Sequence, residues 1–211
     1  QAGADVNHRT GRHIWYTSFN FDMLGVKFAG ATPFWRAAYA TDLDAMRLLV
    51  AWGADPAIAT RKVPSRRFGR RGNDEDKSGL PPVPTGGPGV HPIHAASGVG
   101  YGEGFAANQH SHAPDSWLAA VRYLVEEHGA DVNVRDLNGY SAVHHAASRG
   151  DNELIEYLVQ QGADVSVVSR RGETTVDMAN GPRQRVQPFP ATIALLESLG
   201  AVNNHNCQSC E

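Results

Sequence analysis

The stretch "GADVNVRDLNGYSAVHHAASRGDNELIEYLVQQGAD", residues 129–164, contains one complete copy of a pattern that recurs along the chain. It begins and ends with Gly-Ala-Asp, and the two glycines, Gly129 and Gly162, lie 33 residues apart. The same three residues occur at 3–5 and 53–55, and a diverged Gly-Ala-Val stands at 200–202. Self-similarity at a period of roughly 20–50 residues predicts a stack of similar structural units.

The residues inside this stretch predict a turn followed by two short helices. Asp136-Leu137-Asn138-Gly139 is a turn sequence, with glycine where a positive φ is expected. Ser141 is placed to cap a first helix that begins Ala142-Val143-His144. Residues 150–152 break that helix, and 153–161 carry apolar residues at helical spacing before Gly162 releases the chain. Such a unit is too small to bury its own apolar side, so neighbouring units must stack.

A second landmark, the start of each first helix, measures how regular the units are. These starts are Thr32-Pro33-Phe34, His91-Pro92-Ile93-His94, Ser141-Ala142-Val143-His144 and Thr174-Thr175-Val176-Asp177. From the start to the next repeat glycine is 21 residues for Thr32 and for Ser141, 38 for His91 and 26 for Thr174. Extra residues therefore lie inside the unit that begins at His91, and two further insertions precede the starts at Thr32 and His91.

These motifs resemble the ankyrin repeat, and the resemblance covers most of the chain. The signature residues are Thr32-Pro33-x-x-x-Ala37-Ala38, His91-Pro92-Ile93-His94-x-Ala96 and Ser141-x-Val143-His144-x-Ala146-Ala147, each followed by a Leu/Val-rich helix and Gly-Ala-Asp. The chain departs from the family pattern at Trp35 and Asp177, which stand where the family has histidine. The resemblance implies an all-α repeat solenoid of stacked helix-turn-helix repeats, with three long loop insertions.

This register divides the chain into eight segments. They are the end of a truncated repeat (1–11), an aromatic insertion (12–30), a repeat (31–60), a basic and then Pro/Gly-rich insertion (61–90), a repeat with an inserted loop at 98–114 (91–138), a regular repeat (139–171), a C-terminal capping repeat (172–203) and a tail with C-x-x-C (204–211). Because residues 1–7, "QAGADVN", match the end of a repeat, we expect the chain to belong to a longer protein.

Composition and motifs narrow the classes of function. Of 211 residues, 41% are hydrophobic and 19% charged, and the net charge is −3, so we do not expect nucleic acid as a partner. The sequence has no apolar run long enough to span a membrane, no phosphate-binding loop and no G-x-S-x-G or H-E-x-x-H motif. We expect a soluble, non-enzymatic protein with no cofactor and no small-molecule substrate, in either the cytoplasm or the periplasm.

The insertion at 12–30 is rich in aromatic residues. Trp15, Phe19 and Phe21 alternate with other residues, as one face of a strand would, and Tyr16 lies among them. One interpretation is that the segment folds back over the open end of the stack. The other is that it binds a partner, because aromatic residues dominate the anchors of protein interfaces.

The insertion at 61–90 begins with six basic residues and ends in "SGLPPVPTGGPG". The basic residues are Arg61, Lys62, Arg66, Arg67, Arg70 and Arg71. A solvated loop, a contact with an acidic protein and a contact with nucleic acid are all compatible with this charge. The Pro-rich part is typical of a stiff spacer or of a segment that docks on an aromatic groove.

Histidine and cysteine raise a second hypothesis. The loop at 98–114 contains Tyr101, His110 and His112, which could lie near His91 and His94 and hold zinc or copper. The opposing interpretation gives His94 and His144 a structural hydrogen-bonding role near a helix start. Cys207 and Cys210 fit a disulfide, half of a metal site or two idle thiols.

The sequence therefore supports two functions. The first is a protein–protein recognition or assembly module that binds through Trp15, Tyr16, Phe19, Phe21, Arg66, Arg67, Arg70, Arg71, Tyr101, His110 and His112, aided by a rim of His8, Arg9, Arg135, Asn138, Arg170 and Arg171. The second is an accessory subunit or domain of a larger redox or metal-handling assembly.

Overall fold

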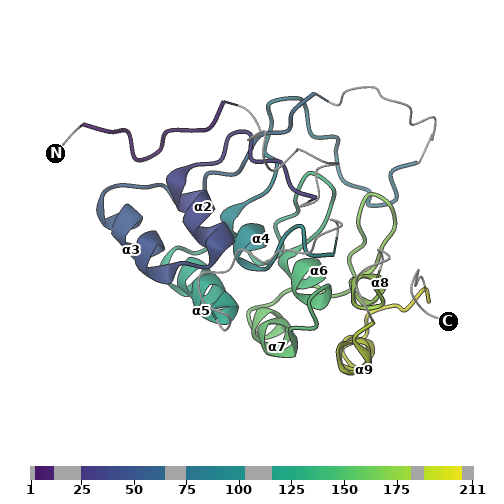
Figure 1. The fold of residues 1–211 in the computed structure, drawn as a ribbon. Helices are drawn as coiled ribbons and strands as arrows, with labels where there is room; N and C mark the ends of the chain where they lie inside the picture. Colours follow the sequence, from purple (N-terminus) through teal and green to yellow (C-terminus); the bar gives the residue numbers. More distant parts are fainter. Residues whose placement is uncertain (1–2, 12–24, 65–74, 103–115, 182–187, 206–211) are drawn as a thin grey trace.

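The computed structural model describes residues 3–11, 25–64, 75–102, 116–181 and 188–205. These residues form two layers of short helices with a row of turns along one side (Figure 1). The first layer contains α2 (Pro33–Ala40), α4 (Pro92–Ala96), α6 (Ala142–Ala147) and α8 (Thr175–Ala179). The second contains α3 (Leu43–Ala51), α5 (Trp117–Arg122) with its π-helical continuation η1 (Tyr123–Glu127), α7 (Asn152–Gln160) and α9 (Pro190–Ser198).

The helices pack both within and between repeats. Each first helix contacts the second helix of its own repeat, and α2, α4, α6 and α8 contact one another in that order. The apolar residues between them form one continuous core, in which Trp35, Leu124, Leu154 and Met178 are fully buried. The fold is an all-α repeat solenoid, as the period predicted.

The helix starts confirm the landmarks found in the sequence. The hydroxyl of Thr32 accepts a hydrogen bond from the backbone N–H of Trp35 at 3.1 Å. The side chain of Thr174 accepts from the N–H of Asp177 at 3.1 Å, and Asp177 accepts in return from the N–H of Thr174. These contacts satisfy N–H groups that have no partner inside the helix, so they fix where each first helix begins.

The Gly-Ala-Asp motif ends one helix and opens the next turn. Gly129 and Gly162 have φ of +63° and +89°, in the left-handed region that glycine adopts without strain. The aspartate then accepts a hydrogen bond at 2.8 Å from the N–H two residues further on, as Asp131 does from Asn133 and Asp164 from Ser166. The motif is therefore a helix stop joined to an Asx turn.

A hairpin-like turn, here called a finger, precedes each first helix. The four fingers comprise residues 5–11 with 25–31, 55–62 with 86–90, 131–140, and 164–173. Within the first, the N–H of Gly30 donates to the carbonyl of Thr10 at 2.8 Å, and within the third that of Asp136 donates to Tyr140 at 2.9 Å. The chain thus enters and leaves each insertion, 12–30 and 61–90, through the two hydrogen-bonded sides of a finger. Among the described helices, none combines the length and apolar character needed to cross a membrane.

Candidate functional site

The fingers are joined to one another by a row of backbone hydrogen bonds. The N–H of Arg61 donates to the carbonyl of Ala29, that of Leu137 to Gly89, and that of Arg170 to Asn138, at 2.7, 2.9 and 2.9 Å. Each bond links one finger to the next. The fingers therefore form a single rigid ledge along the stack, and this ledge is the candidate site.

An asparagine adds a side-chain bridge at two of the junctions between fingers. The carboxamide of Asn7 donates to the carbonyl of Gly53 at 3.1 Å and accepts from the N–H of Asp55 at 2.8 Å. Asn133 makes the same pair of contacts with Gly162 and Asp164, at 2.9 and 2.8 Å. One carboxamide thus satisfies a donor and an acceptor on the following repeat.

Two arginines reinforce the same two junctions. The guanidinium of Arg9 donates to the carbonyl of Ala59 at 2.5 Å, and that of Arg135 donates to the carbonyl of Val168. Burial, as the largest cause, lowers the pKa of both arginines. Their guanidinium groups are therefore engaged inside the ledge, although the sequence placed them on a rim for partners. The middle junction has Ala57 and Ala59 where its neighbours have asparagine and arginine.

The buried histidines have the structural role that was one of the two interpretations. Nδ1 of His94 accepts from the N–H of His91 at 3.2 Å, and Nε2 lies 2.9 Å from the carbonyl of Val134. In the same way, Nδ1 of His144 accepts from the N–H of Ser141 at 3.2 Å, and Nε2 lies 3.3 Å from the carbonyl of Glu173. Both rings use one nitrogen as acceptor and the other as donor, which is the neutral form. Burial, the largest cause, lowers the pKa of each to about 3. Neither ring has a nitrogen left for a metal.

The two departures from the histidine pattern have different outcomes. Trp35 donates its indole N–H to the carbonyl of Val90 at 2.8 Å, so it bonds the next finger as the histidines do. Asp177, in the last described repeat, accepts from the carboxamide of Asn204 at 2.9 Å. In each described repeat, the side chain at this position therefore bonds either the next finger or the tail.

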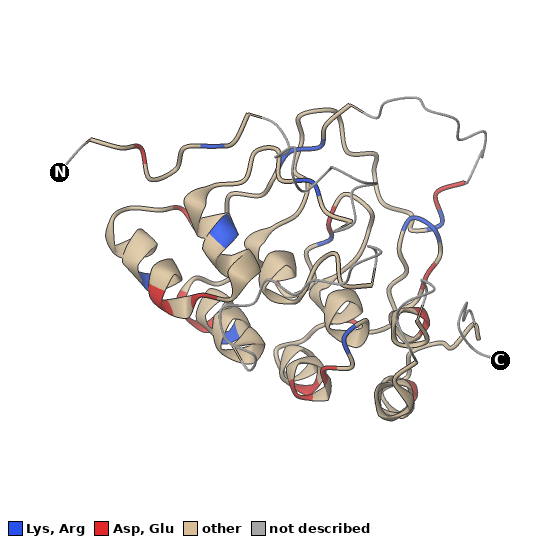
Figure 2. Ribbon diagram, in the orientation of Figure 1, with Lys and Arg blue, Asp and Glu red and all other residues tan. Residues whose placement is uncertain are grey.

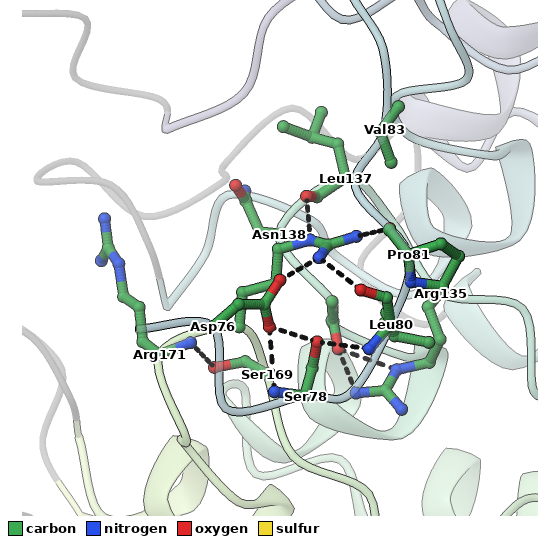
Figure 3. A network of polar contacts seen from close by, with 12 residues as sticks. Asp76, Ser78, Leu80, Pro81, Val83, Arg135, Leu137, Asn138, Ser169 and Arg171 are labelled. Atoms are coloured by element: carbon green, nitrogen blue, oxygen red, sulfur yellow. Dashed lines mark hydrogen bonds and ion pairs between the residues drawn. The ribbon is translucent and has the colours of Figure 1, made fainter. Parts of the chain in front are cut away.

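A network around Arg170 attaches the second insertion to the last finger (Figure 3). Its guanidinium donates to the carbonyls of Leu137, Leu80 and Pro81 at 3.0, 3.3 and 2.7 Å, and it pairs with the carboxylate of Asp76. Alongside, the N–H of Lys77 donates to the carbonyl of Arg170 at 3.1 Å. Residues 76–81 therefore lie against the outer edge of the ledge as an additional strand-like segment.

Hydrogen bonds within the insertion stabilise the conformation in which it contacts the last finger. The hydroxyl and N–H of Ser78 both donate to Asp76, at 2.6 and 3.0 Å, and this contact, followed by Arg170, holds the pKa of Asp76 below its usual value. The ammonium of Lys62 donates to the carbonyl of Val83 at 2.6 Å, which ties the Pro-rich part to the start of the insertion. The described part of this insertion therefore belongs structurally to the ledge.

Replacing Arg170 with alanine is expected to release residues 76–81 from the ledge, because it removes every side-chain bond of that network to the last finger. We expect the N–H of Lys77 to lose its hydrogen-exchange protection and the free energy of unfolding to fall by about 1–3 kcal/mol. Arg171→Ala, at the exposed neighbouring position, is the control and should leave both unchanged. Retained protection of Lys77 in the Arg170 variant would contradict the proposed attachment.

The surface of the second helices is mostly acidic. The second helices carry the exposed acidic residues Asp44, Glu126, Glu127, Glu153, Glu156 and Glu197. Red segments occur along this layer in Figure 2. Arg47 and Arg122 on this layer pair with Glu127 and Glu126, each at 3.0 Å. A partner that docks on the second helices therefore meets a mostly acidic surface.

Most of the binding residues predicted from the sequence lie outside the described residues. These are Trp15, Tyr16, Phe19, Phe21, Arg66, Arg67, Arg70, Arg71, His110 and His112, and the same holds for Cys207 and Cys210. Tyr101 is described and partly buried, and its N–H donates to the carbonyl of Gly98 at 3.1 Å. Within the described part of the chain, no group of three or more His, Cys, Asp or Glu side chains is arranged to hold a metal ion.

Comparison with known proteins agrees with this architecture. Residues 109–159 match the family model of ankyrin repeats in many copies. The chain is 43% identical over 56 residues to BCL-6 corepressor-like protein 1 of Mus musculus, covering 26% of this chain and 3% of that protein. It is 40% identical over 62 residues to ankyrin repeat and SAM domain-containing protein 6 of Rattus norvegicus, covering 29% and 7%. A 33% identity over 69 residues links it to an ankyrin repeat-containing protein of Schizosaccharomyces pombe, covering 29% and 32%.

The stacked helix pairs, the fingers and the capped Thr-Pro or Ser starts define a helical repeat protein. The family match over residues 109–159, together with this fold, supports an ankyrin-repeat protein. Ankyrin repeats are generally protein–protein interaction modules and are typically non-catalytic. The matched region spans from 3% to about a third of the length of these three relatives.

Proposed function

We propose that this chain is a non-enzymatic module of a longer protein, which joins the ankyrin stack to another folded protein surface. The observation that carries the proposal is the location of exposed large apolar side chains. Among the described residues they occur at the two ends of the stack: Leu48 and Trp52 at α3, and Leu199 and Val202 after α9. Large exposed apolar patches on a folded protein commonly mark interaction surfaces.

The flank of α3 is open where inner repeats are closed. Leu48, five residues before its repeat glycine, is 60% exposed, whereas the equivalent Leu124 and Tyr157 are 1% and 8% exposed. Among the described residues, none buries at this end the position that the inner repeats bury against a neighbour. Covering a leucine fully contributes about 1.5–3 kcal/mol, which gives this flank a substantial driving force for association.

A groove beside Trp52 gives the flank a shape that a protein segment can fill. It has a volume of about 560 Å³ and is lined by 3–6, Pro33, Leu48, Leu49 and Trp52. Trp52 is 63% exposed at its edge. Tryptophan is among the residues that contribute most to binding at protein interfaces, particularly next to a well-formed groove. We propose that an apolar side chain of the partner enters this groove and that Trp52 covers it.

The two insertions extend the proposed contact surface. The first leaves the first finger after Gly11 and carries Trp15, Tyr16, Phe19 and Phe21. The second carries Arg66, Arg67, Arg70 and Arg71 between the finger residue Lys62 and the attached segment 76–81. We propose that the aromatic residues contact the same apolar partner surface and that the arginines pair with acidic groups on it, with Tyr101, His110 and His112 as further contacts.

Changing Leu48 and Trp52 together to serine is expected to leave the melting temperature nearly unchanged, because both side chains are exposed. Recovery of the bound partner in a pull-down should fall at least about tenfold, which corresponds to about 1.4 kcal/mol. Val202→Ser is the matched control: the residue is 59% exposed but lies at the opposite end of the stack and does not line the groove beside Trp52, where the partner is proposed to bind, so this variant should bind normally.

The same pull-down tests the insertions through Trp15→Ala with Phe19→Ala, and through Arg66→Glu with Arg70→Glu. Full partner recovery with all three double variants would exclude the proposed surface. If the recovered species is a further repeat region of the same protein, the contact serves assembly of the longer stack.

A further inference from the structure

The middle junction between fingers has a backbone carbonyl and a backbone N–H whose equivalents at the two neighbouring junctions bind an asparagine side chain. At the junctions on either side, a repeat glycine carbonyl and an aspartate N–H bind the carboxamide of Asn7 or Asn133. At the middle junction the equivalent groups are the carbonyl of Gly129 and the N–H of Asp131, and Ala57 stands at the asparagine position. Within the described chain, neither group has a hydrogen-bond partner.

A pocket lies at this place. It has a volume of about 240 Å³, and its wall includes Ala57, Gly129 and Asp131 together with Pro56, His91, Pro92, Ile93, Leu124, His128, Ala130 and Val134. Nε2 of His128 is buried and has no hydrogen-bond partner among the described residues. The pocket thus combines an apolar wall with a donor, an acceptor and an imidazole nitrogen. The residues Gly129 and Asp131 are exposed, so a ligand from outside the chain can reach them. Nε2 of His128 is buried, and buried polar atoms normally have a hydrogen-bond partner, which points to a polar ligand beside it.

We propose that this pocket binds a primary carboxamide, the side chain of an asparagine or glutamine presented by a partner protein. A carboxamide offers an N–H to the carbonyl of Gly129 and an oxygen to the N–H of Asp131, as Asn7 and Asn133 do at the neighbouring junctions. A carboxylate would bring a second oxygen against the carbonyl and a negative charge toward the side chain of Asp131. The arrangement therefore selects the amide over the acid.

The size and lining of the pocket fit one side chain. Pockets for drug-sized molecules measure about 300–1,000 Å³, which is larger than this one. Pro56, Pro92 and Leu124 provide an apolar wall for the methylene group that carries the carboxamide. The inference rests on the proposed recognition function in one respect, that the carboxamide belongs to a partner protein. The pocket lies on a different surface from the groove beside Trp52.

Titration with N-acetyl-asparagine-N-methylamide, followed by amide NMR, tests the proposal without any partner. The backbone N–H resonance of Asp131 is expected to move and saturate, while those of Asp55 and Asp164 stay fixed because Asn7 and Asn133 already occupy their sites. The matching aspartate derivative should bind at least tenfold more weakly. An Asp131 resonance that does not move, or moves equally with both compounds, would overturn the proposal.

Two reciprocal variants make the test specific. Ala57→Asn supplies the carboxamide from within the chain and should abolish the response of Asp131. Asn133→Ala exposes the equivalent pair at the next junction and should create a new response at Asp164. Binding that persists in the Ala57 variant would contradict the site. Failure of this titration would leave the pull-down result for Leu48 and Trp52 unaffected, so the two proposals fail separately.

Discussion

Replacing Trp35 with alanine is expected to lower the free energy of unfolding by about 3–5 kcal/mol, the usual range for removing a buried large aromatic side chain. The indole is fully buried, stacks on Tyr39 with ring centroids 5.4 Å apart, and meets Phe28 edge-on at 5.7 Å. Its loss would leave a cavity and an unpaired carbonyl at Val90. Urea unfolding of the variant and the parent chain measures the difference.

Two further substitutions separate packing from hydrogen bonding at this position. Trp35→Phe keeps most of the apolar volume but leaves the carbonyl of Val90 without its donor, so we expect a loss of about 1–3 kcal/mol. Trp35→His restores a ring N–H of the kind that His94 and His144 use, and should be more stable than Trp35→Ala. A Trp35→Ala variant within about 1 kcal/mol of the parent would show that the aromatic cluster does not hold the first two repeats together.

Mild acid is expected to destabilise the stack strongly, through its buried histidines. Burial lowers the pKa of His94 and His144 to about 3 in the folded chain, whereas an unfolded histidine titrates near about 6.5. The unfolded state therefore takes up protons first. The contribution is fully present above about pH 6.5 and is lost as the pH falls toward 3, at about 1.4 kcal/mol per pH unit for each histidine. Unfolding at pH 5 should require about 4 kcal/mol less than at pH 7.

The slope of stability against pH identifies the groups responsible. His91, whose pKa burial also lowers, adds to the same trend. Burial alone would raise the pKa of Asp136, but His145, His94 and the N–H of Tyr140 together hold this pKa below its usual value. Its contribution is therefore lost only when the pH falls below about 4. His144→Gln should reduce the slope between pH 6.5 and 4.5 by about 1.4 kcal/mol per unit. An unchanged slope in urea titrations of this variant would rule out His144 as a source.

The repeating part of the molecule could be predicted from the sequence because each of its signals acts locally. A glycine that needs a positive φ, a Ser or Thr that caps a helix and an Asp that closes an Asx turn specify their structure within about four residues. This is why the helix from Asn152 to Gln160 falls within one residue of the range expected for it. The hydrogen-bonding role of His94 and His144 was one of two interpretations, and it followed from the resemblance to the ankyrin start position.

The features between repeats could not be predicted in this way. Arg170 was expected on a partner-facing rim, but its guanidinium binds residues about 90 positions away in the insertion, a pairing that no local pattern encodes. The pocket at the middle junction had a visible signal, since Ala57 breaks the Gly-Ala-Asp-Val-Asn phrase of residues 3–7 and 129–133. That signal has meaning only once the contacts of Asn7 and Asn133 are known.

The attachment of residues 76–81 to the last finger changes how this stack should come apart. In a linear array, each repeat touches only its neighbours, so the terminal repeat can fray while the rest stays folded. Here a segment inserted between the two sides of the second finger reaches past the third finger and binds the fourth, through Lys77 and Arg170. Loss of the C-terminal repeat then requires release of an element from the middle of the sequence. The described repeats should consequently unfold with greater cooperativity than their number alone predicts, at the cost of slower folding from the longer loop that must close.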